Sequence, residues 1–269
     1  MIPAAKHPSK EPPTDGSVSA PVNGLSNVHR RLVIALAALC LAVGIFPAQQ
    51  RRAEAQTGKP LLYVFLQLDA KSSAVEKALQ QHLPDVAVTV FGRFRDFEEV
   101  FGSVRPDAVL CITPVLEYRN EPVTLQGRRG GESVEAYVLA SEGQPLNGSL
   151  AGKTIGVVDL MGREGTQSFL NRLLKTSDVK MKRVSKIEDL LPLLEFSEAD
   201  GVVLPRSAAA RLAERTRLPI KMRDLPDGLV GLPAVSVVNA AVRGVVVKSF
   251  QALDGDTNGL LGIDSWSVQ

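Results

Sequence analysis

The sequence predicts an α/β protein with two lobes, in which mostly parallel sheets are flanked by helices. Strand-like and helix-like segments alternate from Pro60 onward, and the alternation occurs in two runs separated by a turn-rich stretch at 144–153. Hydrophobic residues make up 45% of the 269 residues, which is enough for a sizeable core. Because a strand–helix–strand order implies a right-handed crossover between parallel strands, each run predicts one sheet.

The first run predicts three buried strands joined by two helices. Apolar stretches rich in β-branched and aromatic residues predict the strands, and apolar residues at helical spacing predict the helices. The expected strands lie at 61–68, 86–92 and 107–113, and the expected helices at 70–83 and 95–104.

The second run repeats this order after an alternating strand at 133–140. It predicts strands at 154–160, 179–184, 199–205 and 219–225, and helices at 166–176, 185–196 and 206–217. A last strand and helix, at 232–253, follow when the second lobe is complete, so we expect them to return to the first lobe. The expected division is 59–140 with 235–269 for lobe 1, and 141–234 for lobe 2.

The N-terminal region differs from the rest in composition. Residues 1–27 are rich in Pro, Ser and Lys without an apolar period, which predicts a disordered leader. Basic residues then precede an apolar run at 32–46, and 28–55 ends in small residues of the kind a signal peptidase reads. The run has about 15 residues, fewer than the ~20 of a spanning helix. We therefore expect a cleaved export signal and a periplasmic protein, with an uncleaved membrane anchor as the alternative.

Charge and motifs exclude several functional classes. The formal net charge is +2, which gives no indication of a nucleic-acid partner. GxSxG, HExxH, CxxC and Walker motifs are missing from the sequence, and GRRGGES reads as an exposed turn, so we expect no enzyme, no cofactor and no metal. Asp254, Asp256 and Asn258 could begin a calcium loop, but Ser265 stands where such a loop needs Glu. A helix, a polar turn and a last short helix are the preferred interpretation.

Three stretches resemble a known family. SVEAYVLASEGQPLNGSLAGKTIGVVDLMGREGTQSFLNRLL resembles the middle of type 2 periplasmic solute-binding proteins, above all the phosphonate-binding receptors of ABC transporters, with Leu150, Gly152 and Lys153 matching their L-x-G-K turn. EADGVVLP resembles a strand of their second lobe, and FQALDGDTNGLLGIDSWSV resembles their C-terminus. The resemblance covers 59–269.

This resemblance implies a two-lobe periplasmic binding protein type 2 fold and a receptor function. The expected ligand is a small anionic solute, phosphonate-like or another oxyanion, held between the lobes. A monomer that delivers its solute to the membrane permease of an ABC transporter is the first hypothesis. The alternative is a non-transport accessory or sensor protein with a degenerate cleft that binds a periplasmic protein.

Candidate ligand-binding residues follow from the topology. In open α/β sheets, ligands bind beyond the carboxyl ends of the strands, where helix N-termini present free N–H groups that favour anions. The candidates in the first lobe are Gln67, Asp69, Ser72, Ser73, Arg93, Thr113 and Tyr118. Those in the second lobe are Arg163, Gly165, Thr166, Gln167, Ser168, Arg206 and Ser207. As an alternative, the hydroxyls only cap helices and the arginines are only solvated.

Overall fold

The computed structural model describes residues 58–68 and 70–269. The expected leader at 1–27, the expected signal or anchor at 28–55 and the candidate Asp69 lie outside the described residues. Among the helices of the described part, none combines the length and apolar character that crossing a membrane requires.

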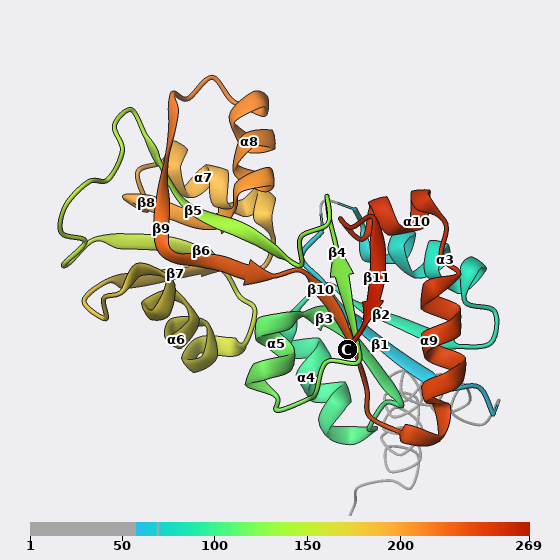
Figure 1. Cartoon of the computed structure of the whole chain (residues 1–269). Helices are drawn as coiled ribbons and strands as arrows, with labels where there is room; N and C mark the ends of the chain where they lie inside the picture. Colours follow the sequence, from blue (N-terminus) through green and yellow to red (C-terminus); the bar gives the residue numbers. More distant parts are fainter. Residues whose placement is uncertain (1–57, 69) are drawn as a thin grey trace, which may run out of the picture. The chain divides into compact units, whose positions relative to one another are not determined.

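The first sheet combines a parallel core with antiparallel strands. Its strands are β1 (Leu61–Phe65), β2 (Ala87–Phe91), β3 (Ala108–Ile112), β4 (Leu125–Arg128), β10 (Pro233–Val237) and β11 (Ser265–Val268). They are ordered β11-β4-β10-β3-β1-β2 (Figure 1). Strands β2, β1 and β3 are parallel neighbours, whereas β10 and β11 each run antiparallel to their neighbours.

The second sheet has the same kind of construction. Its strands are β5 (Val134–Glu142), β6 (Thr154–Val158), β7 (Lys180–Val184), β8 (Gly201–Pro205) and β9 (Ile220–Gly231). They are ordered β7-β6-β8-β5-β9, with β7, β6 and β8 parallel and β5 antiparallel to both of its neighbours. Both sheets are therefore mixed, and the crossovers predicted from the sequence account for their parallel cores.

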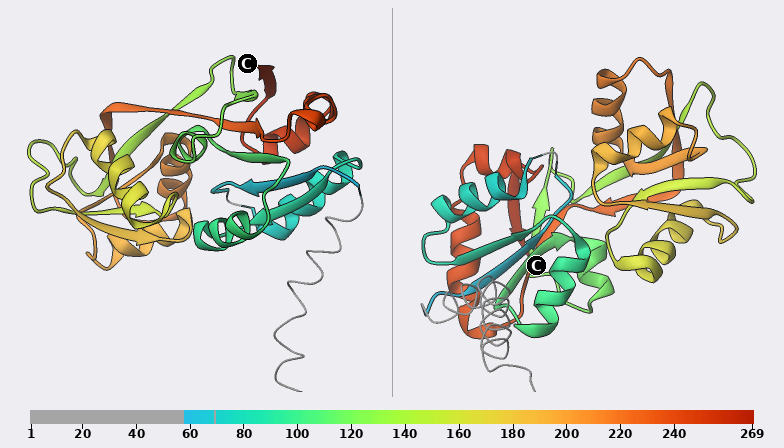
Figure 2. Two further views of the ribbon diagram at one scale, coloured as in Figure 1. Left: turned by 90° about the horizontal axis from the view of Figure 1, so that it is seen from below. Right: turned by 180° about the vertical axis from the view of Figure 1, so that it is seen from behind.

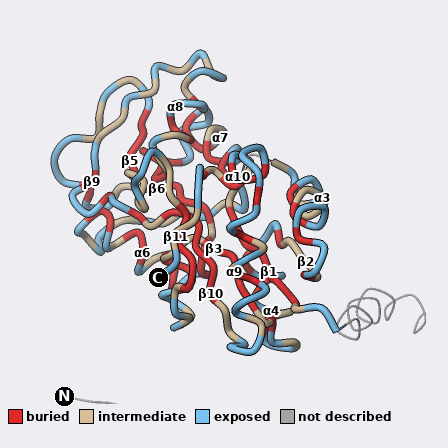
Figure 3. The backbone as a smooth tube through the Cα atoms, turned by 45° about the vertical axis from the view of Figure 1, so that its right-hand side comes forward, coloured by how far each residue is buried: buried red, intermediate tan, exposed pale blue. Residues whose placement is uncertain are grey.

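Helices cover both faces of each sheet. With the first sheet are α3 (Ser72–His82), α4 (Phe94–Ser103), α5 (Thr113–Tyr118), α9 (Arg243–Gln251) and α10 (Gly255–Leu260). With the second are α6 (Gly162–Leu174), the 3₁₀ turn η1 (Ile187–Asp189), α7 (Leu190–Glu195) and α8 (Arg206–Arg215), and a second turn, η2 (Ala240–Val242), precedes α9. The buried residues lie on the strands and on the faces of the helices that pack against them (Figure 3).

Alternation along β1 divides the first lobe's core between two faces. Tyr63 and Phe65 face a cluster that includes Phe97 of α4, and the Phe65 and Phe97 rings are stacked 5.4 Å apart. Leu62 and Val64 belong to a second cluster with residues of α3 and α9. A strand buried on both faces reads as a continuous apolar run, which explains the sequence pattern at 61–65.

Two segments of the chain connect the two sheets, and they are called the first and the second crossover from here on. The chain leaves the first sheet after β4 and joins the second at Val134, then returns between β9 and β10 at Leu232. Strands β5 and β9 lie side by side along this path (Figure 2). The boundaries expected at 140/141 and 234/235 fall within β5 and β10, because the turn-rich stretch at 144–153 follows β5, whereas the chain changes sheets before β5 begins.

The C-terminal segment differs from its prediction. The expected polar turn is helix α10, capped by Asp254, whose Oδ1 accepts a 2.8 Å hydrogen bond from the Thr257 backbone N–H. The expected last helix is strand β11, and its Trp266 donates from Nε1 to Oδ1 of the buried Asn258 at 2.9 Å. The acidic and amide residues that suggested a calcium loop therefore include a cap and a buried hydrogen-bond partner.

Candidate functional site

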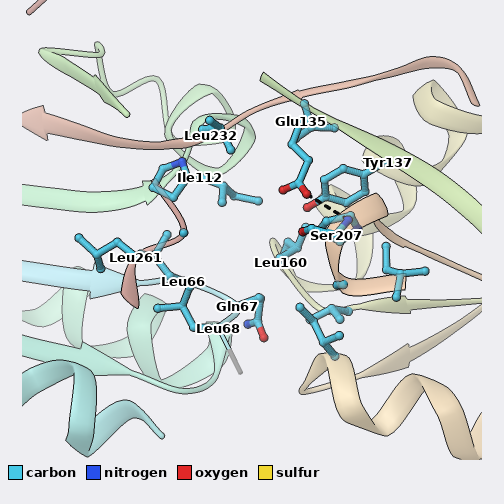
Figure 4. Close-up of a pocket in the computed structure, with 18 of the residues that line it drawn as sticks. Leu66, Gln67, Leu68, Ile112, Glu135, Tyr137, Leu160, Ser207, Leu232 and Leu261 are labelled. Carbon is cyan, nitrogen blue, oxygen red and sulfur yellow. Dashed lines mark hydrogen bonds between the residues drawn. The ribbon is translucent and has the colours of Figure 1, made fainter. Parts of the chain in front are cut away.

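A cavity of about 510 Å³ lies at the carboxyl ends of strands from both sheets (Figure 4). Its walls include residues at or just beyond the ends of β1, β3, β6 and β8, together with residues of β5, β9, β10, α8 and the segment 259–262. The walls are mainly apolar and include Leu66, Ile112, Leu160, Leu204, Leu232 and Leu261. A cavity of this size, at this edge of the sheets, suits a small organic molecule.

Few polar groups reach the cavity. Gln67 lies two residues beyond β1, and its buried Nε2 has no hydrogen-bond partner within 58–68 and 70–269. Tyr137 of β5 is buried, and burial raises the pKa of its hydroxyl well above the ordinary value, so the group stays neutral and can donate or accept. Gln67 and Tyr137 come from different sheets, so a molecule in the cavity can contact both lobes.

Glu135 joins three segments at the cavity wall. Its Oε1 accepts a hydrogen bond from the Ser207 backbone N–H, in the first turn of α8, at 3.2 Å. The same oxygen lies 3.2 Å from Nη1 of Arg129, whose Nε donates to the carbonyl oxygen of Gly262 at 2.6 Å. A chain of polar contacts thus runs from the 259–262 segment, through the first crossover, to the start of α8.

The turn between β6 and α6 is filled by its own side chains. Thr166 is fully buried, and its Oγ1 accepts from the backbone N–H groups of Leu160 at 3.2 Å and Met161 at 3.1 Å. The same hydroxyl donates to Oδ1 of Asp159 at 3.2 Å, while Oδ2 of Asp159 pairs with Arg183 at 2.6 Å. Thr166, whose hydroxyl was expected to hold an anion, therefore has three protein partners.

Residues of the first lobe also cover the start of α6. A Cβ atom on Gly165 would lie only 2.8 Å from Cε2 of Tyr118, so the tyrosine ring packs directly on the glycine backbone. Gly162 has a φ of +67°, which glycine adopts without strain, and Phe94 lies beside it. Tyr118 and Gly165, both predicted to touch ligand, contact each other here.

Of the predicted residues that the structure describes, Gln67 and Ser207 line the cavity. Thr113 lies near the second crossover, where its hydroxyl contacts the Gln126 side chain and the Leu232 carbonyl. Arg206 is turned to an ion pair with Asp224. Thr113 and Arg206 therefore lie near strand ends, but both have partners within the protein.

The remaining candidates lie away from the cavity lining. Ser72 and Ser73 begin α3, whose N-cap, Lys71, makes no side-chain capping bond, and Arg93 is exposed at the N-cap of α4. A separate, shallow groove on the second lobe is lined by Arg163, Glu164, Gln167, Ser168 and Met181.

Sequence reasoning missed Glu135, Tyr137 and Arg129. Glu135 and Tyr137 alternate along β5, which the sequence identified as a strand but not as a cavity wall. Arg129 belongs to the GRRGGES segment, interpreted as an exposed turn; Gly130 and Gly131 are exposed, but Arg129 is half-buried. The alternation of Glu135 and Tyr137 on one strand face was the available signal. Across 58–68 and 70–269, no group of three or more His, Cys, Asp or Glu is arranged to hold a metal ion.

Comparisons with known proteins identify the fold. No protein-family model matches the sequence, and no curated protein sequence matches significantly. The substrate-binding protein of an amino acid ABC transporter is similar in structure, with a TM-score of 0.52 at 16% identity over 76% of this chain and 96% of that one. The VFT2 domain of Bordetella pertussis BvgS, as a double mutant, gives 0.51 at 15% over 80% and 97%.

A third similar structure is the GluR0 ligand-binding core in complex with L-glutamate, with a TM-score of 0.51 at 14% identity over 77% of this chain and 98% of that one. At such identities the likeness establishes the fold alone. The two-lobe fold of type 2 periplasmic binding proteins, predicted from the sequence, is thereby confirmed. The phosphonate-binding type stays a prediction.

Proposed function

We propose that this chain is a periplasmic solute-binding protein that encloses a small, mainly apolar solute between its lobes. The observation that carries the proposal is the cavity of about 510 Å³ at the strand ends of both sheets. A solute there contacts both lobes, so its binding energy favours the closed arrangement over an open one. The closed form would be presented to an ABC-transporter permease.

The lining supports an apolar body with few hydrogen-bonding groups. Leucine, isoleucine and valine account for half of the lining residues, and the buried Nε2 of Gln67 offers a donor that has no hydrogen-bond partner among the described residues. A buried donor without an acceptor costs ~1–3 kcal/mol, so a solute oxygen at this place would contribute directly to affinity. The oxyanion expected from the sequence has less support, because the turn at Thr166 is occupied by protein groups.

The test compares two substitutions on one helix. Ala208 of α8 lines the cavity, whereas Ala210 on the same helix is exposed. Ala208→Leu adds volume to the cavity wall and Ala210→Leu adds the same atoms outside it. Thermal-shift screening of the natural chain with small apolar alcohols, amines, amides and acids identifies binders, and calorimetry measures them in both variants.

We expect Ala208→Leu to weaken binding at least about tenfold, equivalent to ~1.4 kcal/mol, and Ala210→Leu to leave it unchanged. Equal affinities in the two variants would place the solute elsewhere. If no compound raises the melting temperature while one periplasmic protein binds reproducibly to the purified chain, the accessory or sensor alternative is preferred.

A further inference from the structure

We infer that Glu135 makes the cavity selective for solutes with a neutral or cationic hydrogen-bond donor, such as a hydroxyl or an amine, and against carboxylates and phosphonates. This inference rests on the proposed function and specifies its solute class. Glu135 acts as a specificity-determining residue at the cavity wall.

The carboxylate of Glu135 already occupies the place beside the start of α8 and Arg129, where an anionic solute would gain the most binding energy. The first turn of α8 presents backbone N–H groups beside the cavity, and Ser207 N donates to Oε1 of Glu135. Arg129, which also lines the cavity, pairs with the same oxygen and with the Gly262 carbonyl. The helix start and this arginine therefore have a negative partner within the protein, as helix N-termini favour.

The second oxygen of Glu135 is what a solute would meet. Within the described residues, Oε2 receives no hydrogen bond, and the side chain is 17% exposed. A hydroxyl or ammonium group can donate to this oxygen. A second carboxylate beside it would repel it, because charges interact more strongly near a mainly apolar wall than in water.

The opposite wall offers a hydrogen-bond donor that complements this oxygen. Gln67, from the first lobe, presents its unpaired Nε2 and can donate to a solute oxygen, so a hydroxyl can both give and receive a hydrogen bond in the cavity. Arg211 lines the cavity too, but it is exposed to solvent, where its charge is screened.

The experiment uses three probes that share one apolar body: benzylamine, benzyl alcohol and benzoate. Ligand-observed NMR at millimolar concentrations gives their relative affinities for the natural protein and for Glu135→Gln, whose amide oxygen can still accept from Ser207 N. The matched control is Glu132→Gln, an exposed glutamate in the same crossover segment. Circular dichroism and melting temperature verify that each variant is folded.

We expect the natural protein to prefer benzylamine or benzyl alcohol over benzoate by about tenfold or more. In Glu135→Gln this preference should fall about tenfold through tighter benzoate binding, and Glu132→Gln should keep it. Benzoate binding as tightly as the other two in the natural protein overturns the inference, whether or not the variant folds, and leaves the proposed function standing. If none of the three probes binds to the natural protein or to Glu135→Gln, the proposed solute-binding function is itself contradicted.

Discussion

Two strand-to-helix turns of the second lobe occupy equivalent places in the sheet but have different hydrogen-bond partners. The turns from β6 to α6 and from β8 to α8 both place a helix N-terminus at the carboxyl edge of one sheet. At the first, the buried hydroxyl of Thr166 accepts hydrogen bonds from the backbone of the turn, and the Tyr118 ring packs on Gly165. At the second, Ser207 N donates to Glu135, a side chain that borders the cavity.

The difference shows how a helix start becomes structural or functional. Polar groups at a helix N-terminus need partners, and both turns supply them from the protein. When the partner is a buried hydroxyl of the helix itself, as with Thr166 in α6, the turn contributes to stability alone. When the partner is a charged group at a cavity wall, it also determines which solutes can approach.

The largest expected effect comes from removing the buried partner at the first turn. Thr166→Val keeps the shape but leaves Leu160 N, Met161 N and Asp159 without the hydroxyl. We expect the free energy of unfolding to fall by ~2–3 kcal/mol, measured by urea denaturation, because the two backbone N–H groups stay buried without a partner.

Thr166→Ser should recover most of that loss, and Ser168→Ala, at an exposed position on the same helix, should change stability by less than ~0.5 kcal/mol. If Thr166→Val is as stable as the natural chain, the buried hydroxyl does not hold the first turn, and the contrast between the two turns is lost.

A somewhat smaller loss of stability is expected when a methyl group is added at Gly165, where the Tyr118 ring packs on α6. In Gly165→Ala the new methyl would lie 2.6 Å from Cβ of Met161 and 2.8 Å from the Tyr118 ring, and such overpacking costs ~1–3 kcal/mol. At Gly102 of α4 an added Cβ would meet no atom within 4 Å, so Gly102→Ala should instead stabilise by up to ~1 kcal/mol.

Adding Tyr118→Ala to Gly165→Ala separates the two clashes. The double variant should cost less than the two single variants together, since removal of the ring relieves one of them. Additive free energies of unfolding in chemical denaturation would show that Tyr118 does not rest on Gly165 in solution.

The sequence predicts the elements of both turns but not their partners. The apolar runs at β6 and β8 indicate buried strands, and the strand-end rule correctly indicates the edge where the cavity lies. Thr166 and Ser207 are both hydroxyl residues near the start of a helix that follows a strand, at the fifth residue of α6 and the second residue of α8. Which one faces the cavity depends on contacts with Asp159 and Glu135, and no local pattern encodes such contacts.

The same reasoning explains the missed residues. Glu135 and Tyr137 reach the cavity from β5, an antiparallel strand, whereas the strand-end rule concerns parallel strands. The error at the C-terminus is of another kind: Asp254, Asp256 and Asn258 suit a turn as well as the helix start that they form. Beyond this helix, β11 pairs with β4, and Trp266 packs against Phe250 with 5.1 Å between ring centroids; no local pattern encodes these contacts.

The smallest expected effect tests a third helix start, α10, which has its own carboxylate but lies at the surface. The hydrogen bond from Thr257 N, then the Thr257 hydroxyl and the nearby His82, lower the pKa of Asp254 below its ordinary value of 3.8. A lowered pKa in the folded state means that the carboxylate stabilises the fold above pH 3.8 and that this contribution is lost as the pH falls through the lowered value. Asp254→Asn should therefore lower the melting temperature slightly at neutral pH, and the difference should shrink below pH 3.8.

Repeating the comparison in a His82→Gln background removes the ion pair at 3.0 Å and leaves the helix cap. A melting-temperature difference that grows on acidification would mean that Asp254 does not stabilise α10 as a carboxylate cap.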